Sequence, residues 1–224
     1  MLWGIDYLTH DIPVFTFAPS ESYESWLKYF GYLKTIQYPM KLLVCDDNEN
    51  IKAACRYLFP QVIVQTCQVH FLENIRKQLQ VRTDPTYELF MHDLKQELFS
   101  RKITRTDFEK RAFKLFKKYE HDRVAVQVLL RIHAYTEELT AATRVTHGPC
   151  TTNIIESYNS HLEARLKSIK GFKAFHSAYR WLNAYILRRR FRPFTDCGKK
   201  FRHLNGTAAI QHTVQKGKTL PKLF

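Results

Sequence analysis

The sequence predicts an α/β fold, and two features support that prediction. Short apolar runs at 41–45 and 62–64 are each followed by a segment with helical spacing, which gives the order strand, helix, strand, helix. Further amphipathic segments then follow over 84–139 without strands between them. Alternating units of this kind build parallel sheets with ligand sites at the carboxyl ends of the strands. We therefore expect a small parallel sheet followed by an all-helical segment.

The N-terminal elements are expected to be two strands and a helix. Residues 2–8 and 12–18 are predicted as strands joined by a turn at Thr9-His10-Asp11, and a helix is predicted over 20–36. This leaves the chain with only two strands before its first helix.

The parallel unit follows in a clear order. The strand at 41–45 ends at Asp46, and Asp47-Asn48-Glu49-Asn50 supplies residues typical of a turn and a helix start. Pro60 ends that helix, and the strand at 62–64 leads to a helix over 71–79. The middle of the chain is expected to form three helices, at 84–98, 106–119 and 124–139. The first should turn an apolar face to the core, made of Leu89, Phe90, Leu94 and Leu98.

Length and composition indicate one elaborated globular domain. At 224 residues and 45% hydrophobic, the chain can bury a sizeable core. Five scattered cysteines favour a reducing compartment, and neither a signal peptide nor a long apolar span is seen. We expect an intracellular protein, cytoplasmic or nucleoid-associated, without a membrane partner.

Two carboxylates stand out as candidate ligands of Mg²⁺. Asp46 ends a predicted strand, and Glu156 opens a predicted helix beside an apolar stripe that consists of Ile155, Tyr158, Leu162, Leu166 and Ile169. Each acid also has a structural alternative. Asp46 or Asp47 could cap the next helix, and Glu156 could pair with Asn153 in a capping box.

Two motifs together resemble the Mutator-like DDE transposases, including their bacterial insertion-sequence relatives. The first runs from Asp46 to His70 with Pro60 and Cys67-x-x-His70, and the second is Thr151-Thr152-Asn153-x-x-Glu156-Ser157-x-Asn159. The resemblance covers most of the chain. It implies a ribonuclease-H-like core in which an Asp, Asp, Glu triad binds two Mg²⁺ (or Mn²⁺) ions. Asp46 matches the second Asp and Glu156 the Glu, and an all-helical insertion separates them.

The resemblance also implies a division of the chain. Its parts are the first part of the core (1–80), the helical insertion (81–145), core-completing helices with Glu156 (146–190) and a basic C-terminal tail (191–224). The family's first strand and its first catalytic Asp have no counterpart here. Asp6 is a poor candidate, because the segment after its strand has room for only one further strand before the helix. We expect an N-terminally truncated relative that is inactive by itself.

Basic charge gathers in the last quarter of the chain. From Gly171 to Phe224 there are twelve Lys or Arg residues against one acid, Asp196. Guanidinium groups alternate with aromatic rings around 188–194, a pattern suited to phosphate contact and stacking, although a solvated basic helix end is the alternative. The residues expected to bind DNA are Arg188, Arg189, Arg190, Arg192, Lys199 and Lys200.

Cys67-x-x-His70 has two interpretations. With His147 and Cys150 it could complete a zinc site, but such spacing arises easily among ten histidines and five cysteines, so zinc is not expected. The resemblance instead implies packing and support beside the active site. Asn153 and Asn159 are assigned a similar supporting role around Glu156.

The sequence thus favours a DDE transposase, or a remnant of one, that cleaves and joins DNA strands at transposon ends with a divalent metal. Its partners would be double-stranded DNA, both transposon ends and target, and further copies of itself when intact. The alternative is a catalytically dead, transposase-derived DNA-binding protein. Another nuclease of the same fold is disfavoured by the long helical insertion.

Overall fold

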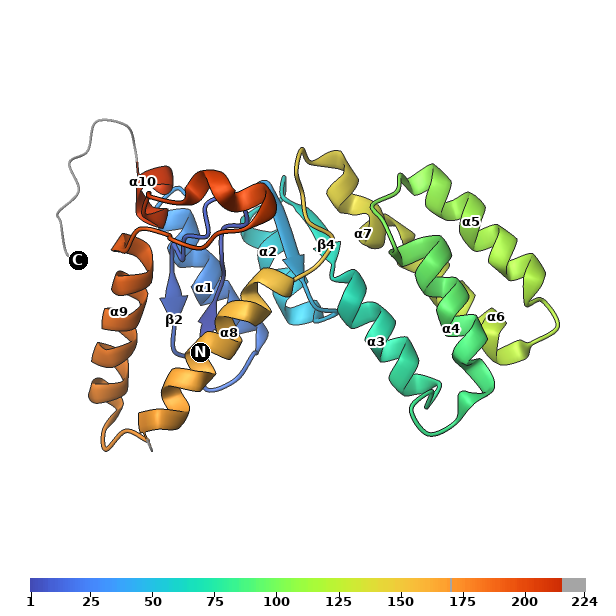
Figure 1. Cartoon of the computed structure of the whole chain (residues 1–224), viewed down its shortest axis with the longest axis horizontal. Helices are drawn as coiled ribbons and strands as arrows, with labels where there is room; N and C mark the ends of the chain where they lie inside the picture. Colours follow the sequence, from blue (N-terminus) through green and yellow to red (C-terminus); the bar gives the residue numbers. More distant parts are fainter. Residues whose placement is uncertain (170, 215–224) are drawn as a thin grey trace. The chain divides into compact units, whose positions relative to one another are not determined.

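The computed structural model describes residues 1–169 and 171–214, which form a mostly helical chain with two small two-stranded sheets (Figure 1). Contacts divide the chain into two units. Unit 1 comprises Met1–Ser20 with Asn153–Phe224, and unit 2 comprises Glu21–Thr152. The mixed α/β class predicted from the sequence is confirmed. No helix in the described parts of the chain is long and apolar enough to cross a lipid bilayer.

The sheet of unit 1 is shorter than predicted. Strands β1 (Leu2–Trp3) and β2 (Phe15–Thr16) pair antiparallel, so the predicted lengths of 2–8 and 12–18 are wrong. The reason is a tight turn around Asp6, whose carboxylate accepts hydrogen bonds from the backbone N–H groups of Leu8 and Thr9, both at 2.9 Å. An aspartate that binds nearby backbone in this way competes with the strand ladder.

Helices supply the rest of unit 1, namely α8 (Asn153–Ile169), α9 (Phe175–Phe191), η4 (Lys199–Leu204) and α10 (Ala209–Thr213). Its core is formed by Trp3, Ile12, Tyr158, Leu162, Leu182 and Ile186. The apolar stripe predicted on α8 is confirmed at Tyr158 and Leu162 but not at Leu166, which is exposed. Part of the predicted basic tail, 215–224, lies outside the described residues.

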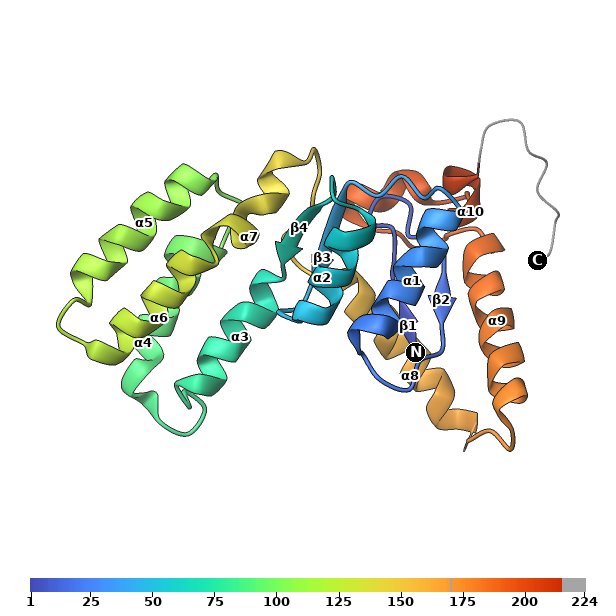
Figure 2. The same cartoon turned by 180° about the vertical axis from the view of Figure 1, so that it is seen from behind.

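Unit 2 contains the predicted strand, helix, strand, helix order. Strand β3 (Leu42–Cys45) and strand β4 (Ile63–Thr66) pair in parallel, and α2 (Glu49–Leu58) connects them. Helix α3 (Gln68–Gln78) follows β4 directly, and α1 (Tyr23–Thr35) packs against α2 (Figure 2).

The start of α2 settles which residue caps this helix. Asn48 is the N-cap, and its side-chain oxygen accepts from the N–H of Asn50 at 3.0 Å. The alternative in which Asp46 or Asp47 caps the helix is therefore wrong. Both acids stand before the cap and are left for other contacts.

The helical part of unit 2 follows α3. Its elements are η1 (Pro85–Tyr87), α4 (Glu88–Leu94), the π-helical turn η2 (Lys95–Phe99), α5 (Arg105–Lys118), α6 (Arg123–Ala134), α7 (Thr136–Thr140) and η3 (Ala141–Arg144). Buried apolar side chains from α3 to α7 form one core between them.

One predicted core position in this part is wrong. Leu89 is 64% exposed, whereas Phe90, Met91 and Leu94 are buried. Successive helical residues turn by about 100°, so a stripe that includes Met91 leaves Leu89 on the far side of α4. The helix predicted over 124–139 also divides in two, because α6 ends at Ala134 before α7 begins.

Candidate active site

Asp46 lies at the carboxyl end of the parallel strands of unit 2. Asp46 directly follows Cys45, the last residue of β3, and Cys67 directly follows Thr66, the last residue of β4. Cys45 and Thr66 are paired in the sheet, and the Cys67 N–H donates to the Cys45 carbonyl at 2.8 Å. His70, in the first turn of α3, places Nδ1 2.6 Å from Asp46 Oδ1. The Asp46 side chain is 57% exposed. The structure thus joins two residues of the first motif at the edge where such sheets bind ligands.

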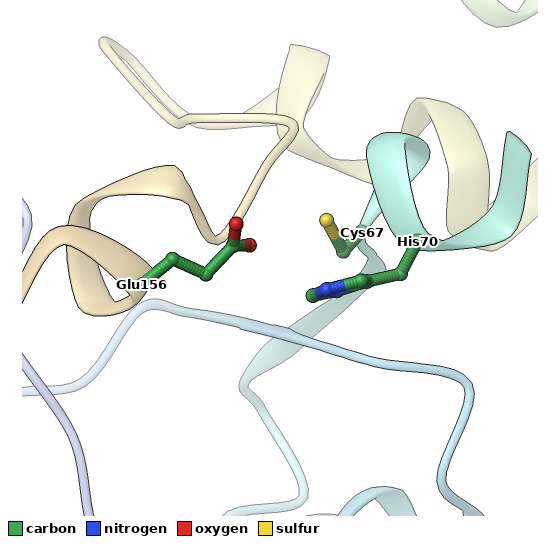
Figure 3. Close-up of side chains that lie close together, drawn as sticks. All are labelled: Cys67, His70 and Glu156. Atoms are coloured by element: carbon green, nitrogen blue, oxygen red, sulfur yellow. The ribbon is translucent and has the colours of Figure 1, made fainter. Parts of the chain in front are cut away.

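Cys67 and His70 share a partner in Thr152. The Thr152 hydroxyl lies 3.2 Å from Cys67 Sγ and 3.3 Å from His70 Nδ1, and the Thr152 N–H donates to Sγ at 3.4 Å. Cys67 is fully buried, and Figure 3 shows both side chains at the start of α3. The Gln68 N–H adds a bond to the Cys150 carbonyl at 3.0 Å. Cys67-x-x-His70 therefore holds the segment that leads into α8.

The zinc alternative needs Cys67, His70, His147 and Cys150 to converge. Among the residues that the structure describes, no three of these four bring their ligand atoms within 4.8 Å of one another. Burial also raises the pKa of Cys150, which disfavours the thiolate that zinc binds. The structure does not assemble that ligand set.

Glu156 belongs to unit 1, in the first turn of α8 (Figure 3). The helix begins at Asn153, so Asn153 takes the first helical position rather than the N-cap position that a capping box with Glu156 requires. Asn153 is exposed, whereas the Asn159 side-chain oxygen accepts from the Trp3 indole N–H at 2.9 Å. The contact of Asn159 is thus with the core of its own unit.

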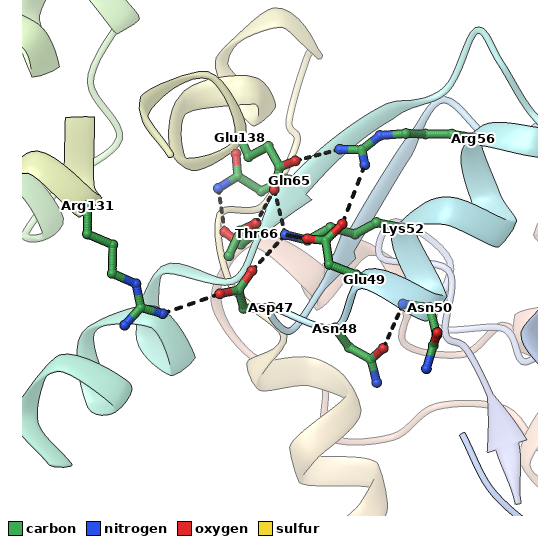
Figure 4. A network of polar contacts seen from close by, with 10 residues as sticks. All are labelled: Asp47, Asn48, Glu49, Asn50, Lys52, Arg56, Gln65, Thr66, Arg131 and Glu138. Atoms are coloured by element: carbon green, nitrogen blue, oxygen red, sulfur yellow. Dashed lines mark hydrogen bonds and ion pairs between the residues drawn. The ribbon is translucent and has the colours of Figure 1, made fainter. Parts of the chain in front are cut away.

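Asp47, beside Asp46, has a different environment. Its side chain is only 12% exposed, and its two oxygens lie 2.8 Å from the Lys52 ammonium and 3.4 Å from the Arg131 guanidinium (Figure 4). Lys52 is fully buried and binds Glu138 and Glu49 as well, at 2.7 and 3.1 Å. Burial alone would lower the pKa of Lys52, but the bonds to these three carboxylates raise it above its usual value.

This network was not predicted from the sequence. A signal was present, because Lys52 falls on the same face of α2 as the buried Ile51 and Cys55. A charged residue on a buried helix face needs an ionic partner, so that position indicated a buried pair. The helical periodicity of α2 could not show that this partner would be Glu138 on α7.

The six residues predicted to bind DNA, all in unit 1, divide into two groups. Arg190 binds both oxygens of the buried Asp11, at 2.7 and 2.9 Å, and the Arg189 guanidinium lies 4.3 Å from the centre of the Tyr158 ring. The exposed group consists of Arg188, Arg192, Lys199 and Lys200. Lys200 also rests on an aromatic ring, that of Tyr7, at 4.8 Å.

Comparison with known proteins agrees with these motifs. The family model described as "Transposase, Mutator family" matches residues 9–190, a range that contains Asp46, Cys67, His70 and Glu156. The transposases for insertion sequence element IS256 in transposon Tn4001 from Staphylococcus aureus and from Enterococcus faecalis (strain ATCC 700802 / V583) are each 39% identical over 62 residues. That match spans 27% of this chain and 16% of each relative. Since the family model covers most of the sequence, the chain belongs to the Mutator family of transposases.

Proposed function

We propose that this chain carries part of a metal-dependent centre for DNA strand cleavage and strand transfer, with Asp46 and Glu156 as ligands of Mg²⁺ or Mn²⁺. The observation that carries the proposal is the placement of Asp46. It is exposed, it follows a parallel strand, and it bonds to His70 at 2.6 Å. Family membership supports the pairing with Glu156 and a ribonuclease-H-like arrangement of the core.

The donor chemistry at Asp46 fits a hard divalent cation. Mg²⁺ and Mn²⁺ prefer carboxylate oxygens, and an exposed aspartate can offer one without first breaking a buried contact. Cys67, the soft donor nearby, is buried and already accepts two hydrogen bonds from Thr152. When bound, the ions would activate the attacking oxygen and stabilise the leaving oxygen of the phosphodiester.

His70 has a positioning role in this proposal. A carboxylate only accepts hydrogen bonds, so the contact with Asp46 requires the hydrogen on His70 Nδ1. This bond fixes the orientation of the Asp46 carboxylate, as partners of metal ligands commonly do. Cys67 and Thr152 in turn hold the histidine end of α3 in place.

The exposed basic residues of unit 1 are proposed to bind the phosphates of transposon-end and target DNA. Arg188, Arg192, Lys199 and Lys200 are exposed, and Arg189 and Arg190, which contact Tyr158 and Asp11, are less exposed and support the fold. Phosphate contacts of this kind weaken steeply with salt. Several copies of the chain would act together in the whole assembly.

Metal binding provides the first test of the proposal. We expect Mn²⁺, followed by electron paramagnetic resonance, to bind the wild-type chain and to bind Asp46→Asn and Glu156→Gln at least about tenfold more weakly. Asp196→Asn, an exposed aspartate of unit 1, is the matched control and should bind as wild type does. Equal Mn²⁺ affinity in all four proteins would refute the assignment of the two acids.

A plasmid assay separates catalysis from binding alone. Nicking of supercoiled DNA by the chain with Mn²⁺ would overturn the expectation that the chain is inactive by itself. Wild type and Asp196→Asn should then nick the DNA, and Asp46→Asn and Glu156→Gln should not. The second candidate function, a catalytically dead DNA-binding protein, is favoured by the exposed basic group in unit 1. It predicts DNA binding that survives both substitutions, with no nicking in any form.

A further inference from the structure

We infer that a buried ion network centred on Lys52 positions Asp46 for metal binding, and that two helices of the helical part, α6 and α7, take part in it. The inference rests on the proposed function of Asp46. It adds that side chains of α6 and α7 help to position the loop between β3 and α2 that carries Asp46. It assigns Asp47, Lys52 and Glu138 as positioning residues.

The first step is the contact of Asp47 with Lys52. Asp47 Oδ1 lies 2.8 Å from Lys52 Nζ, and neither side chain is more than 12% exposed. Buried ionic contacts of this kind are strong enough to fix the groups that make them, because a broken pair leaves a charge without solvation. Asp46 therefore stands between two fixed positions, the strand residue Cys45 and the bound Asp47.

The second step brings in the helical part. Glu138, on α7, binds Lys52 at 2.7 Å and Arg56 at 2.5 Å, and it accepts from the hydroxyl of Thr66 at 2.7 Å. Thr66 is the last residue of β4, so one carboxylate contacts α2 and a strand end at once. Arg131, on α6, reaches the other oxygen of Asp47 at 3.4 Å.

The third step is the rigid attachment of α7 to β4. Gln65 and Gln68 both donate to the Leu139 carbonyl, at 3.0 and 2.8 Å, and the Gln65 oxygen accepts from the Ala142 N–H at 2.8 Å. Both glutamines are buried. Since these bonds hold the backbone that follows Glu138, a displacement of α7 would move that carboxylate and with it Lys52 and Asp47. Figure 4 shows the Lys52 ammonium together with the carboxylates of Asp47 and Glu138 that it contacts.

Neighbouring glutamates of α7 supply a matched pair of variants. Glu138 belongs to the network, whereas Glu137 binds Arg105 and Arg144 and is 49% exposed. Glu138→Gln and Glu137→Gln change the net charge equally. We expect Glu138→Gln to weaken Mn²⁺ binding about tenfold and Glu137→Gln by less than about twofold. Hydrogen exchange of the peptide containing residues 44–50 should quicken only in Glu138→Gln.

A double variant separates positioning from stability. Lys52→Met alone leaves two carboxylates, those of Asp47 and Glu138, without their main partner, whereas Lys52→Met/Glu138→Gln removes one of these two charges and leaves only that of Asp47. We expect the double variant to unfold closer to the wild-type temperature than Lys52→Met. Mn²⁺ binding should stay weakened about tenfold, because Asp47 still lacks its anchor.

The outcomes distinguish the inference from the proposed function. Equal Mn²⁺ affinity in Glu138→Gln and Glu137→Gln, or a double variant that regains both stability and metal affinity, would overturn the inference while Asp46→Asn still loses the metal. If Asp46→Asn binds Mn²⁺ as wild type does, the proposed function fails. In that case, faster hydrogen exchange at residues 44–50 in Glu138→Gln would still support the conclusion that the network orders this loop. Unchanged exchange would overturn that conclusion too.

Discussion

Two aspartates in loops, one in each unit, have opposite environments. Asp11 in unit 1 is fully buried. Its carboxylate accepts from the Ile12 N–H at 2.9 Å, from Arg190 at 2.7 and 2.9 Å and from the Thr213 hydroxyl at 2.5 Å. Four bonds from three segments of the chain make this acid an anchor between the N-terminal turn, α9 and α10.

Asp46 in unit 2 is more than half exposed and is oriented by His70. The two aspartates therefore differ in burial and in how many protein hydrogen bonds occupy their carboxylate oxygens. A carboxylate whose oxygens are saturated by the protein holds segments together. An exposed carboxylate fixed by one oriented partner retains the ability to bind a ligand. Asp47 and Glu138 belong with Asp11 in this comparison, although they lie close to Asp46 in the fold.

The largest effect is expected at the anchor of unit 1. Asp11→Ala leaves the Arg190 guanidinium without its carboxylate, and breaking a buried pair in this way destabilises proteins by about 3–5 kcal/mol. Urea unfolding followed by circular dichroism measures the change. Asp196→Ala, an exposed aspartate in the same unit, should shift the unfolding free energy by no more than about 0.5 kcal/mol. Equal effects of the two substitutions would show that burial does not separate the two kinds of acid.

A pH-dependent effect is expected from Glu138 in unit 2. Burial alone would raise the pKa of Glu138, but hydrogen bonds from Lys52, Thr66 and Arg56 outweigh it and hold the pKa below the usual 4.5. Because the folded-state pKa is lowered, the stabilisation is complete above pH 4.5 and is lost as the pH falls through the folded-state pKa.

Wild type should therefore exceed Glu138→Gln by about 2 kcal/mol in unfolding free energy at pH 7, as expected for hydrogen bonds to a charged group. The gap should close on acidification below pH 4.5. Urea titrations of both proteins at pH 7, 5 and 3 test this. A gap that stays constant over the series would mean that the Glu138 charge does not stabilise unit 2.

The sequence predicted the parallel unit around Asp46 well, and the reason is local. Apolar runs of strand length, helical spacing and Pro60 fix the order of β3, α2 and β4 without help from distant residues. The register of the parallel strands places Asp46 and Cys67 at one edge of the sheet. The contact of His70 with Asp46 was not itself predicted.

Partners far apart in the chain were not predictable in this way. Asp11 and Arg190 are 179 positions apart, and Asp47 and Arg131 are 84 apart. Helical periodicity indicates which face is buried, but it does not say which charged residue of another element will meet a buried charge. The arginine pattern at 188–190 therefore predicted DNA contact for Arg190, whereas tertiary structure binds it to Asp11. The strands of unit 1 were predicted at too great a length, because the turn at Asp6 interrupts their ladder.

A smaller effect is expected where Asn159 meets Trp3. Asn159→Ala leaves the buried Trp3 indole N–H without its acceptor, which should cost about 1 kcal/mol. Asn159→Asp retains an acceptor oxygen and should recover most of the loss. If Asn159 is an anchor like Asp11, its removal leaves DNA affinity unchanged at constant salt. If Asn159→Ala instead loses DNA affinity but no stability, Asn159 resembles Asp46 in being available for a ligand. Asn153→Ala is the control and should show neither loss.

The smallest change in stability is expected for Asp46→Ala. The side chain is 57% exposed and it contacts a histidine that is itself 35% exposed, so its removal should alter the unfolding free energy by no more than about 0.5 kcal/mol. Urea unfolding at pH 7 without added metal measures this change. With saturating Mn²⁺ the two proteins should separate, because a cation that binds only the folded wild type stabilises it by mass action. If Asp46→Ala without metal loses nearly as much unfolding free energy as Asp11→Ala, Asp46 stabilises the fold as Asp11 does. Its contact with His70 would then be explained by a structural role.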